Sequence, residues 1–379
     1  MLVVTLFERK LAILMIYLAF TPFSLASETI FSENFNDLPD WTSDEIYKSK
    51  NQLDNLSVPG DWYAGTSRPI WSPATSHEDR HAVGEILAKN AEMARGGTGK
   101  SHVNWRESYN PGWSQFNSDS VLLKYFPNGY DELYVEFWIT FSNEMVRTYY
   151  EEQLGQSKIF RIYHFNGDES AIFDYFGDEN KPSFNWDVSG GASTGYGLRN
   201  FQAYLARGDN DIADYIKGLP SKILKTGDVS LSYTTASLNG QAVNGGTSLL
   251  SNFKDGGVIG GGPVSLDQVF GTEEQWVKVA FYVKMNSAPG AADGELMQWI
   301  DNKRILHATS IPWVREGFDM VKWNTIGIGG NDYFQAYHND LRYEEWYAID
   351  DVLVLDGIPE ELLGHKSNAP NPPEGVLLH

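Results

Sequence analysis

The sequence predicts an all-β fold, one large sandwich of two antiparallel sheets with long loops and one or two short helices. Apolar and polar residues alternate with period two in several segments rich in aromatic and β-branched side chains. Long helical patterns are scarce, and glycine pairs at 190–191, 245–246 and 256–257 separate short segments. The length of 379 residues would allow two domains, but we interpret the loosest stretch, 189–271, as loops on one sandwich.

The alternation is clearest at Glu132–Phe141, where every second residue from Leu133 is apolar and faces one side. It recurs at Ser157–Phe165, Trp276–Lys284 and Trp346–Leu355. Short helices are predicted at His81–Met93 and at Asp209–Ile216, where Asp209 would cap the start. The shorter predicted strands are, in chain order, Thr29–Phe35, Val121–Phe126, Ala171–Phe176, Ser183–Val188, Val229–Tyr233, Leu296–Ile300, Lys303–Ala308 and Lys322–Ile328.

The two ends of the chain lie outside this predicted domain, which covers residues 27–358. Arg9 and Lys10 precede the apolar run Leu11–Phe20 and a small-residue site ending at Ala26, which predicts a signal peptide over residues 1–26. A membrane anchor is the alternative, but the run is well short of the roughly 20 residues needed to span a bilayer. Residues 359–379 are rich in Asn and Pro and predict a disordered tail. We therefore expect a secreted protein, extracellular or periplasmic, with no membrane association after cleavage.

The composition excludes several classes of protein. Hydrophobic residues make up 42% of the chain and aromatic residues 14%, which is too much for disorder. The absence of cysteine excludes disulfide scaffolds, cysteine-ligated metals and cysteine nucleophiles. A net charge of -21 argues against nucleic acid as a partner, because phosphate contacts need an excess of Lys and Arg. The same charge would repel a polyanion at long range, although residues 147–225 are much less acidic than residues 319–361.

Three segments in the last third occur in a familiar order. A strand opening with Trp276 is followed by Gly294–Ile305 (GELMQWIDNKRI), in which Asp301 and Asn302 suit a two-residue hairpin turn, and then by Ala348–Leu355 (AIDDVLVL). Together they resemble the late half of the concanavalin A-like jelly roll of secreted polysaccharide lyases and carbohydrate-binding modules. Residues 30–41 resemble that superfamily's first strand, which pairs beside the last one.

The resemblance implies a sandwich with a concave face that holds a polysaccharide. Aromatic side chains could stack there on the apolar faces of sugar rings. Most of the 12 Trp residues must nevertheless fill a large core, and Trp186 is the one we assign provisionally to substrate binding. The oligomeric state is not indicated by the sequence.

The likeness leaves three functions open, namely a lyase, a glycoside hydrolase and a non-catalytic binding or adhesion module. Hydrolases of this fold usually carry E-x-D-x-x-E on one strand, and no such cluster occurs here, although carboxylates from separate strands remain possible. A lyase acting on a uronic acid must neutralise the sugar carboxylate, remove the α-proton and protonate the leaving oxygen. A polysaccharide lyase that works by β-elimination is the reading we favour.

Two segments supply the candidate residues for this chemistry. Residues 333–339 (YFQAYHN) resemble a shortened form of the alginate-lyase motif Y-F-K-A-G-x-Y-N, with Gln where Lys is usual. That likeness implies catalytic roles for Tyr333 and Tyr337 and substrate binding by Gln335 and His338. The companion motif R-(S/T)-E-L-R is absent, and Arg106 begins only a partial match to it. We include Arg106 among the substrate-binding residues.

The second segment is the strand Ser157–Phe165. Arg161 is provisionally the clamp for the substrate carboxylate, Tyr163 the acid and His164 the base, with Lys158 as a binding residue. Strict alternation places Lys158 and His164 on one face and Arg161 and Tyr163 on the other, so they could not share a cleft without a bulge.

No cofactor is required by this chemistry, but a structural calcium ion is possible. Glu33 near the first strand and Asp351 near the last could meet there, because Ca²⁺ prefers carboxylate and carbonyl oxygens. The alternative is that both carboxylates are solvated or hydrogen-bonded locally.

Overall fold

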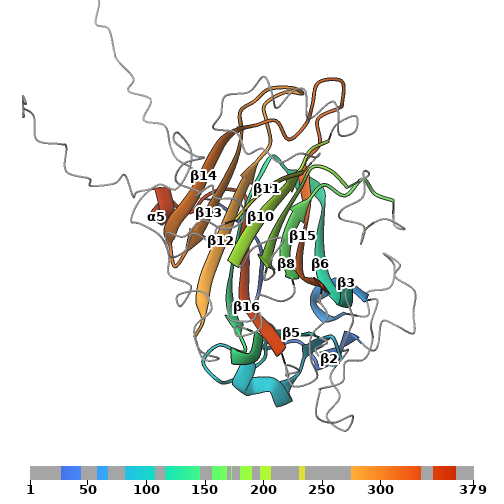
Figure 1. Cartoon of the computed structure of the whole chain (residues 1–379), viewed down its shortest axis with the longest axis vertical. Helices are drawn as coiled ribbons and strands as arrows, with labels where there is room; N and C mark the ends of the chain where they lie inside the picture. The colour runs from blue at the N-terminus through green and yellow to red at the C-terminus, as the bar shows by residue number, and fades with distance from the viewer. Residues whose placement is uncertain are drawn as a thin grey trace, which may run out of the picture.

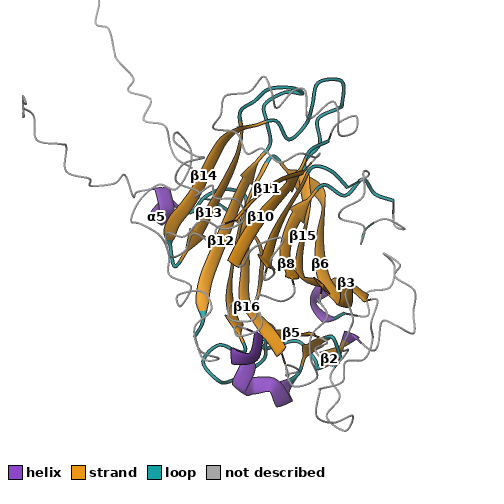
Figure 2. Ribbon diagram, in the orientation of Figure 1, coloured by secondary structure: helices purple, strands orange, loops and turns teal. Residues whose placement is uncertain are grey.

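The computed structural model is an all-β sandwich of two antiparallel sheets, which confirms the predicted fold class (Figures 1 and 2). It describes residues 27–43, 58–66, 82–106, 116–145, 156–168, 172, 180–189, 197–205, 230–234, 275–333 and 345–363. The predicted signal peptide at 1–26 therefore lies outside the described residues. Within those residues, no helix has the length and apolar character needed to cross a membrane.

The larger sheet has nine strands, including the first and the last described strand of the chain. The last strand lies next to the first, with Thr29 opposite Leu355 and Glu33 opposite Val352, as the resemblance implied. The order across the sheet is β14 (Lys303–Ile311), β13 (Gly294–Ile300), β12 (Val277–Lys284), β7 (Glu132–Phe141), β16 (Glu345–Leu355), β5 (His102–Arg106), β4 (Gly84–Ile86) and β2 (Trp41–Thr42), with β1 (Thr29–Glu33) paired to β16.

The smaller sheet has seven strands and packs against the first. Its order is β11 (Ser230–Thr234), β10 (Gly197–Ala203), β9 (Ser183–Ser189), β8 (Gln156–Tyr163), β15 (Trp323–Tyr333), β6 (Phe116–Tyr130) and β3 (Tyr63–Thr66). Strands β6 and β15 run further than the sequence predicts, and β3, β5 and β10 were not predicted. The longer strands allow β15 to pair on both sides, with β6 and with β8.

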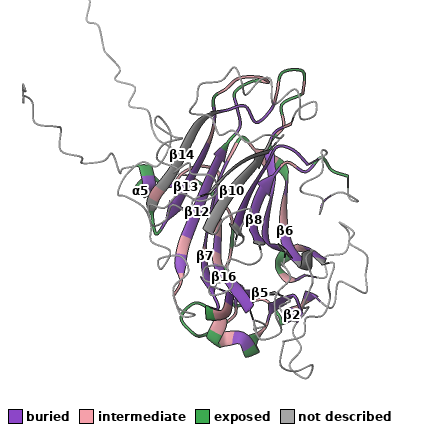
Figure 3. Cartoon of the chain, viewed as in Figure 1, coloured by how far each residue is buried: buried purple, intermediate pink, exposed green. Residues whose placement is uncertain are grey.

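The core fills the space between the sheets, where the described strands are buried (Figure 3). All five apolar residues that alternate along β7 face it, which confirms the predicted face. At its centre Phe281 of β12 lies 4.8 Å from Phe160 of β8 and 5.3 Å from Trp186 of β9, measured between ring centroids. Rings from both sheets therefore interlock, and their burial holds the sheets together.

The hairpin between β13 and β14 forms as predicted. Its turn residues Asp301 and Asn302 have φ of 47° and 63°, which is the left-handed backbone that Asp and Asn tolerate best. The Asp301 carboxylate also accepts a hydrogen bond of 3.0 Å from the backbone of Lys278.

The predicted helix at His81–Met93 is wrong in its first half and confirmed as a short 3₁₀ helix in its second. In its described part the chain forms strand β4, paired with β5, and then a short 3₁₀ helix, η3 (Ala88–Met93). The apolar residues Ala82, Val83 and Ile86 are buried through pairing in the sheet, and this tertiary contact overrides the local helical pattern. The predicted helix Asp209–Ile216 and nearly all of the predicted strand Ala171–Phe176 lie outside the described residues.

The predicted C-terminal tail begins with ordered structure. Residues Glu360–Leu363 form helix α5, and Leu362 is buried in a cluster with Tyr134 and Trp299 on the outer face of the larger sheet. A second 3₁₀ helix, η2 (Pro59–Asp61), precedes β3.

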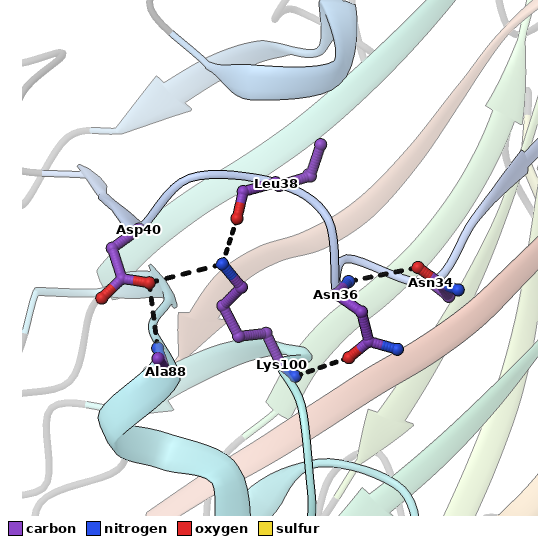
Figure 4. Close-up of polar contacts among 6 residues, drawn as sticks. All are labelled: Asn34, Asn36, Leu38, Asp40, Ala88 and Lys100. Carbon is purple, nitrogen blue, oxygen red and sulfur yellow. Dashed lines mark hydrogen bonds and ion pairs between the residues drawn. The ribbon is translucent and has the colours of Figure 1, made fainter.

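A lysine clamp fixes the turn after β1 (Figure 4). The backbone N–H of Lys100 donates to Asn36 Oδ1 at 2.8 Å, and its ammonium donates to the Leu38 carbonyl and lies 3.4 Å from Asp40 Oδ1. Asp40 Oδ1 also accepts a hydrogen bond from the backbone of Ala88, where η3 begins. The clamp thus ties the first turn of the domain to the segment that leads into β5.

Candidate functional site

A β-bulge at Ile159 brings Lys158 and Arg161 onto the same face of the seven-stranded sheet. In the ladder with β9, Lys158 lies opposite Asp187, whereas Phe160 already lies opposite Trp186, so Ile159 is the extra residue. Ile159 and Phe160 both belong to the core. Since residues opposite each other share a face, Lys158 and Arg161 lie with Asp187 and Asn185 on the outer side.

These four side chains form a polar row, which we define as Lys158, Arg161, Asn185 and Asp187. The exposed fraction is 0% for Arg161 and Asn185, 1% for Asp187 and 9% for Lys158. An ordinary outer face of a sheet is solvated, whereas this row is covered. Buried polar groups in one place are the usual mark of a specific site rather than of a solvated surface.

The guanidinium of Arg161 lies over a strip of glycines in β15. Its Nη2 donates to the Gly329 carbonyl at 2.7 Å and to the Lys158 carbonyl at 3.2 Å. A Cβ on Gly327 would lie 2.9 Å from Arg161 Cγ, and one on Gly330 would lie 2.3 Å from Arg161 Nη2. Glycine at these positions therefore provides the space in which the side chain lies, directed toward the Lys158 end of the strand.

The charge of the polar row suits an anionic ligand. Two cations, Lys158 and Arg161, face one carboxylate, Asp187, within a buried environment. Burying charge is costly unless it meets an opposite charge, and charge-assisted bonds to a carboxylate are among the strongest available to Arg and Lys.

Tyr163 lies on the same face as Arg161 but in a different environment. It belongs to an apolar cluster with Leu123 and Phe165, and its hydroxyl donates to the Ile172 carbonyl at 2.5 Å. This bond ties Tyr163 to Ile172, whereas the Arg161 guanidinium donates to the Gly329 and Lys158 carbonyls.

His164 follows the end of β8 that lies far from Tyr333, another predicted catalytic residue. Ladder pairing places Tyr333 opposite Gln156, and eight residues at about 3.3 Å each put His164 roughly 26 Å away along β8. Its Nδ1 lies 3.0 Å from the Lys322 carbonyl, and half-burial lowers its pKa. The assignment of His164 as base in one site with Tyr333 is therefore corrected, because the strand is too long.

The register places the backbone of Tyr333 near the end of the polar row that Lys158 forms. The backbone of Asp332 pairs with Ser157 and that of Tyr333 with Gln156, next to Lys158. The backbone of Arg106 pairs with Glu345 in the other sheet. The side chains of Tyr333 and Arg106, and the whole of Gln335, Tyr337 and His338, lie outside the described residues, so their roles stay predictions.

Trp186 lies in the core rather than on the outer face. It is fully buried, and its ring centroid is 6.3 Å from that of Phe137 and 5.3 Å from that of Phe281. Its neighbours Asn185 and Asp187 point outward, so alternation turns Trp186 inward. Its assignment to sugar stacking is corrected on this ground.

The two carboxylates proposed for calcium hold protein partners. Asp351 forms a 2.5 Å ion pair with Arg95, whose guanidinium lies 3.9 Å from the centroid of the Trp138 ring. Glu33 accepts a hydrogen bond of 2.7 Å from the backbone of Phe35. No three His, Asp or Glu side chains gather in a metal-binding group within the described ranges. These contacts do not fit a shared calcium site, and calcium stays an untested prediction.

Sequence reasoning missed the partners of Arg161. Asn185 and Asp187 flank Trp186 in a strand that was predicted, so alternation could have placed them together on the outer face. The strip at 327–330 (GIGG) is unusual inside a strand, and such glycines often mark a close approach of another group. The bulge at Ile159 left no signal in the sequence.

Comparison with known proteins gives only distant similarity. No family model matches the sequence, and no curated protein matches it. Among solved structures, the alginate lyase Aly36B is 10% identical and matches over 87% of this chain and 97% of its own, with a TM-score of 0.43. An endo-β-1,4-glucuronan lyase from the fungus Trichoderma reesei is 12% identical over 86% and 95%, with a TM-score of 0.39. The carbohydrate recognition domain of Emp47p is 11% identical over 88% and 98%, with a TM-score of 0.34.

Proposed function

We propose that the protein is a secreted carbohydrate-active enzyme, a lyase that cleaves a polysaccharide containing uronic acid by β-elimination. The observation that carries the proposal is the buried polar row with its two cations, Lys158 and Arg161. Beside it, the outer face continues along β9 and β10, where Arg199 pairs with Asp187 in the ladder.

The chemistry follows from the charge of the row. A cation at the sugar carboxylate disperses the negative charge that develops when the neighbouring α-proton leaves, which lowers the barrier to abstraction. Lys158 is the cation with some exposure, and Arg161 lies behind it against Gly329. We assign carboxylate neutralisation to this pair.

Proton transfer is assigned to the tyrosines beyond the end of β15. A phenolate formed at the site takes the α-proton, and a phenol donates to the leaving oxygen as the bond breaks. Tyr333 is the first candidate, because its backbone pairs with Gln156, two residues before Lys158. Tyr337 is the second candidate.

Binding without turnover is the alternative function. It is supported by the environment of Tyr163, whose hydroxyl donates to the Ile172 carbonyl within an apolar cluster. A binding module would use the same polar row to hold the carboxylates of a polysaccharide, with no proton carrier beside them.

The test compares purified protein on polyglucuronate, polymannuronate, polygalacturonate and a neutral glucan. Release of unsaturated uronate is followed by ultraviolet absorbance, and binding is followed by calorimetry. Lys158→Met should lower kcat/KM about ten- to a hundredfold, the loss expected when a charged hydrogen-bond partner is removed. Lys278→Met is the matched control, because Lys278 is also a partly buried strand lysine but lies in the other sheet, paired with Glu136 at 3.2 Å.

The outcomes separate the two functions. Unsaturated product that depends on Lys158 and not on Lys278 supports the lyase. Polyuronate binding that depends on Lys158 without any product supports the binding module. Equal activity of Lys158→Met and wild type would contradict both assignments of the polar row.

A further inference from the structure

A group of buried polar side chains lies behind β15, on the side that faces the nine-stranded sheet. It consists of His102 and Asn104 from β5 and Ser120 from β6, each with an exposed fraction of 0%. The group lies between the sheets, so it does not belong to the outer polar row.

Gly329 is the point where this group and the polar row meet. Its carbonyl accepts the 2.7 Å hydrogen bond from Arg161 Nη2. On its other side, a Cβ would lie 2.6 Å from the Ser120 carbonyl oxygen, 3.0 Å from Asn104 Nδ2 and 3.2 Å from His102 Cε1. The buried group therefore packs directly against the backbone that holds the guanidinium.

The backbone at Gly329 has little support from β8. The ladder between β15 and β8 is interrupted between Ile328 and Asp332, and Gly329 has a φ of 78°. A glycine in this conformation has wide backbone freedom, so its position must be set by neighbours. Its described neighbours on the inner side are the Asn104 amide, the His102 ring and the Ser120 carbonyl.

Asn104 links the two sheets at this point. Its Nδ2 donates to the Ser120 carbonyl at 3.0 Å, which connects β5 of one sheet to β6 of the other. β6 in turn pairs with β15, with Gly329 opposite Val121. The bond thus fixes the distance between β5 and the strand beside Gly329.

This arrangement is costly, which is a reason to assign it a function. Both ring nitrogens of His102, Ser120 Oγ and Asn104 Oδ1 are buried without a hydrogen-bond partner. Burial lowers the pKa of His102 to about 3. Unpartnered buried groups each cost about 1 to 3 kcal/mol, and natural proteins keep such costs mainly at functional positions.

We infer that Asn104 is a positioning residue for Arg161, acting through Gly329. Its amide holds β5 and β6 at the spacing that presses Gly329 outward, so that the Gly329 carbonyl meets the guanidinium at hydrogen-bond distance. The use of Arg161 in binding a carboxylate rests on the proposed function, but the positioning itself is independent of any ligand.

The experiment measures the guanidinium directly. Hydrogen exchange at the Nη2 protons of Arg161, one of which is donated to the Gly329 carbonyl, is followed by NMR in the full chain, with the signal assigned by its loss in Arg161→Lys. Asn104→Leu keeps the volume and removes the donor, and it should speed this exchange about tenfold, the factor that corresponds to one lost hydrogen bond. His102→Phe keeps the ring that packs on Gly329 and should leave the exchange within about twofold of wild type.

Asn286→Leu is the matched control. Asn286 is equally buried and donates through Nδ2 to the carbonyls of Ala288 and Val314, away from Gly329. If Asn104→Leu does not fold, Asn104→Ser, whose shorter side chain does not reach the Ser120 carbonyl, carries the same expectation.

Two results would overturn the inference: Arg161 exchange unchanged in the Asn104 variant, or the same acceleration in Asn286→Leu. Where a polyuronate is turned over, Asn104→Leu should also lower kcat/KM about tenfold, because Arg161 is then misplaced for carboxylate neutralisation. If none is bound or cleaved, the proposed function fails, while the exchange result still decides the role of Asn104.

Discussion

His102 should make the protein sensitive to acid. The imidazole is completely buried, and burial lowers its pKa from 6.5 to about 3, because the protonated ring would lose its hydration without gaining a partner. Between these two pKa values the unfolded chain binds a proton that the folded chain does not. The contribution of the neutral His102 to the free energy of unfolding is therefore fully present above about pH 6.5 and is lost as the pH falls toward 3.

The expected loss can be worked from the shift. At about pH 5 the unfolded histidine is mostly protonated and the folded one is neutral, so the penalty is the 1.5 units between pKa 6.5 and that pH, at about 1.4 kcal/mol per unit. This gives about 2 kcal/mol less stability at about pH 5 than at about pH 8. Other groups titrate over the same range, so only a difference between variants isolates the contribution of His102.

The assay is denaturant unfolding of wild type and His102→Phe at the two pH values. Phenylalanine cannot be protonated, so the stability of the variant relative to wild type should rise by about 2 kcal/mol on acidification. His164→Phe provides a comparison, because His164 is only half-buried and accordingly less penalised. Parallel losses in wild type and His102→Phe, within about 0.5 kcal/mol, would refute the reasoning.

Other contacts give further predictions. Trp186→Ala should lower the free energy of unfolding by about 3 to 5 kcal/mol in denaturant titration, because it empties part of the core; a loss under about 1 kcal/mol would contradict its placement. Tyr163→Phe should cost about 1 kcal/mol and leave kcat/KM unchanged, since the hydroxyl donates to the Ile172 carbonyl; lost turnover at equal stability would assign Tyr163 to catalysis. Lys100→Met should cost about 1 to 2 kcal/mol by freeing the Leu38 carbonyl, with an unchanged unfolding midpoint arguing against the clamp. If the predicted calcium ion is bound, chelator should lower the thermal midpoint, and an unaltered midpoint would reject it.

Local patterns predicted the fold well where each strand has one apolar face. The five alternating residues of β7 and the Asp301–Asn302 turn formed as expected, because alternation and turn conformation depend on neighbours in the sequence. The helix prediction failed in the first half of His81–Met93, where β4 pairs with β5 and its residues are buried in the sheet.

The candidate site was predictable only in part. Lys158 and Arg161 were chosen for their chemistry, but alternation placed them on opposite faces, and the bulge at Ile159 unites them. The partners Asn185 and Asp187 come from a neighbouring strand, and the register between strands depends on the packing of the whole sheet.

The sequence by itself determined the all-β class, the strand faces and the hairpin turn, because these depend on residues a few positions apart. Only the tertiary structure decided which polar residues lie together. It turned Trp186 into the core, separated His164 from Tyr333 by the length of β8, and placed Asn104 behind Gly329 from the opposite sheet. Such contacts join residues far apart in the chain, and their positions are set by bulges, register and sheet packing that no local pattern records.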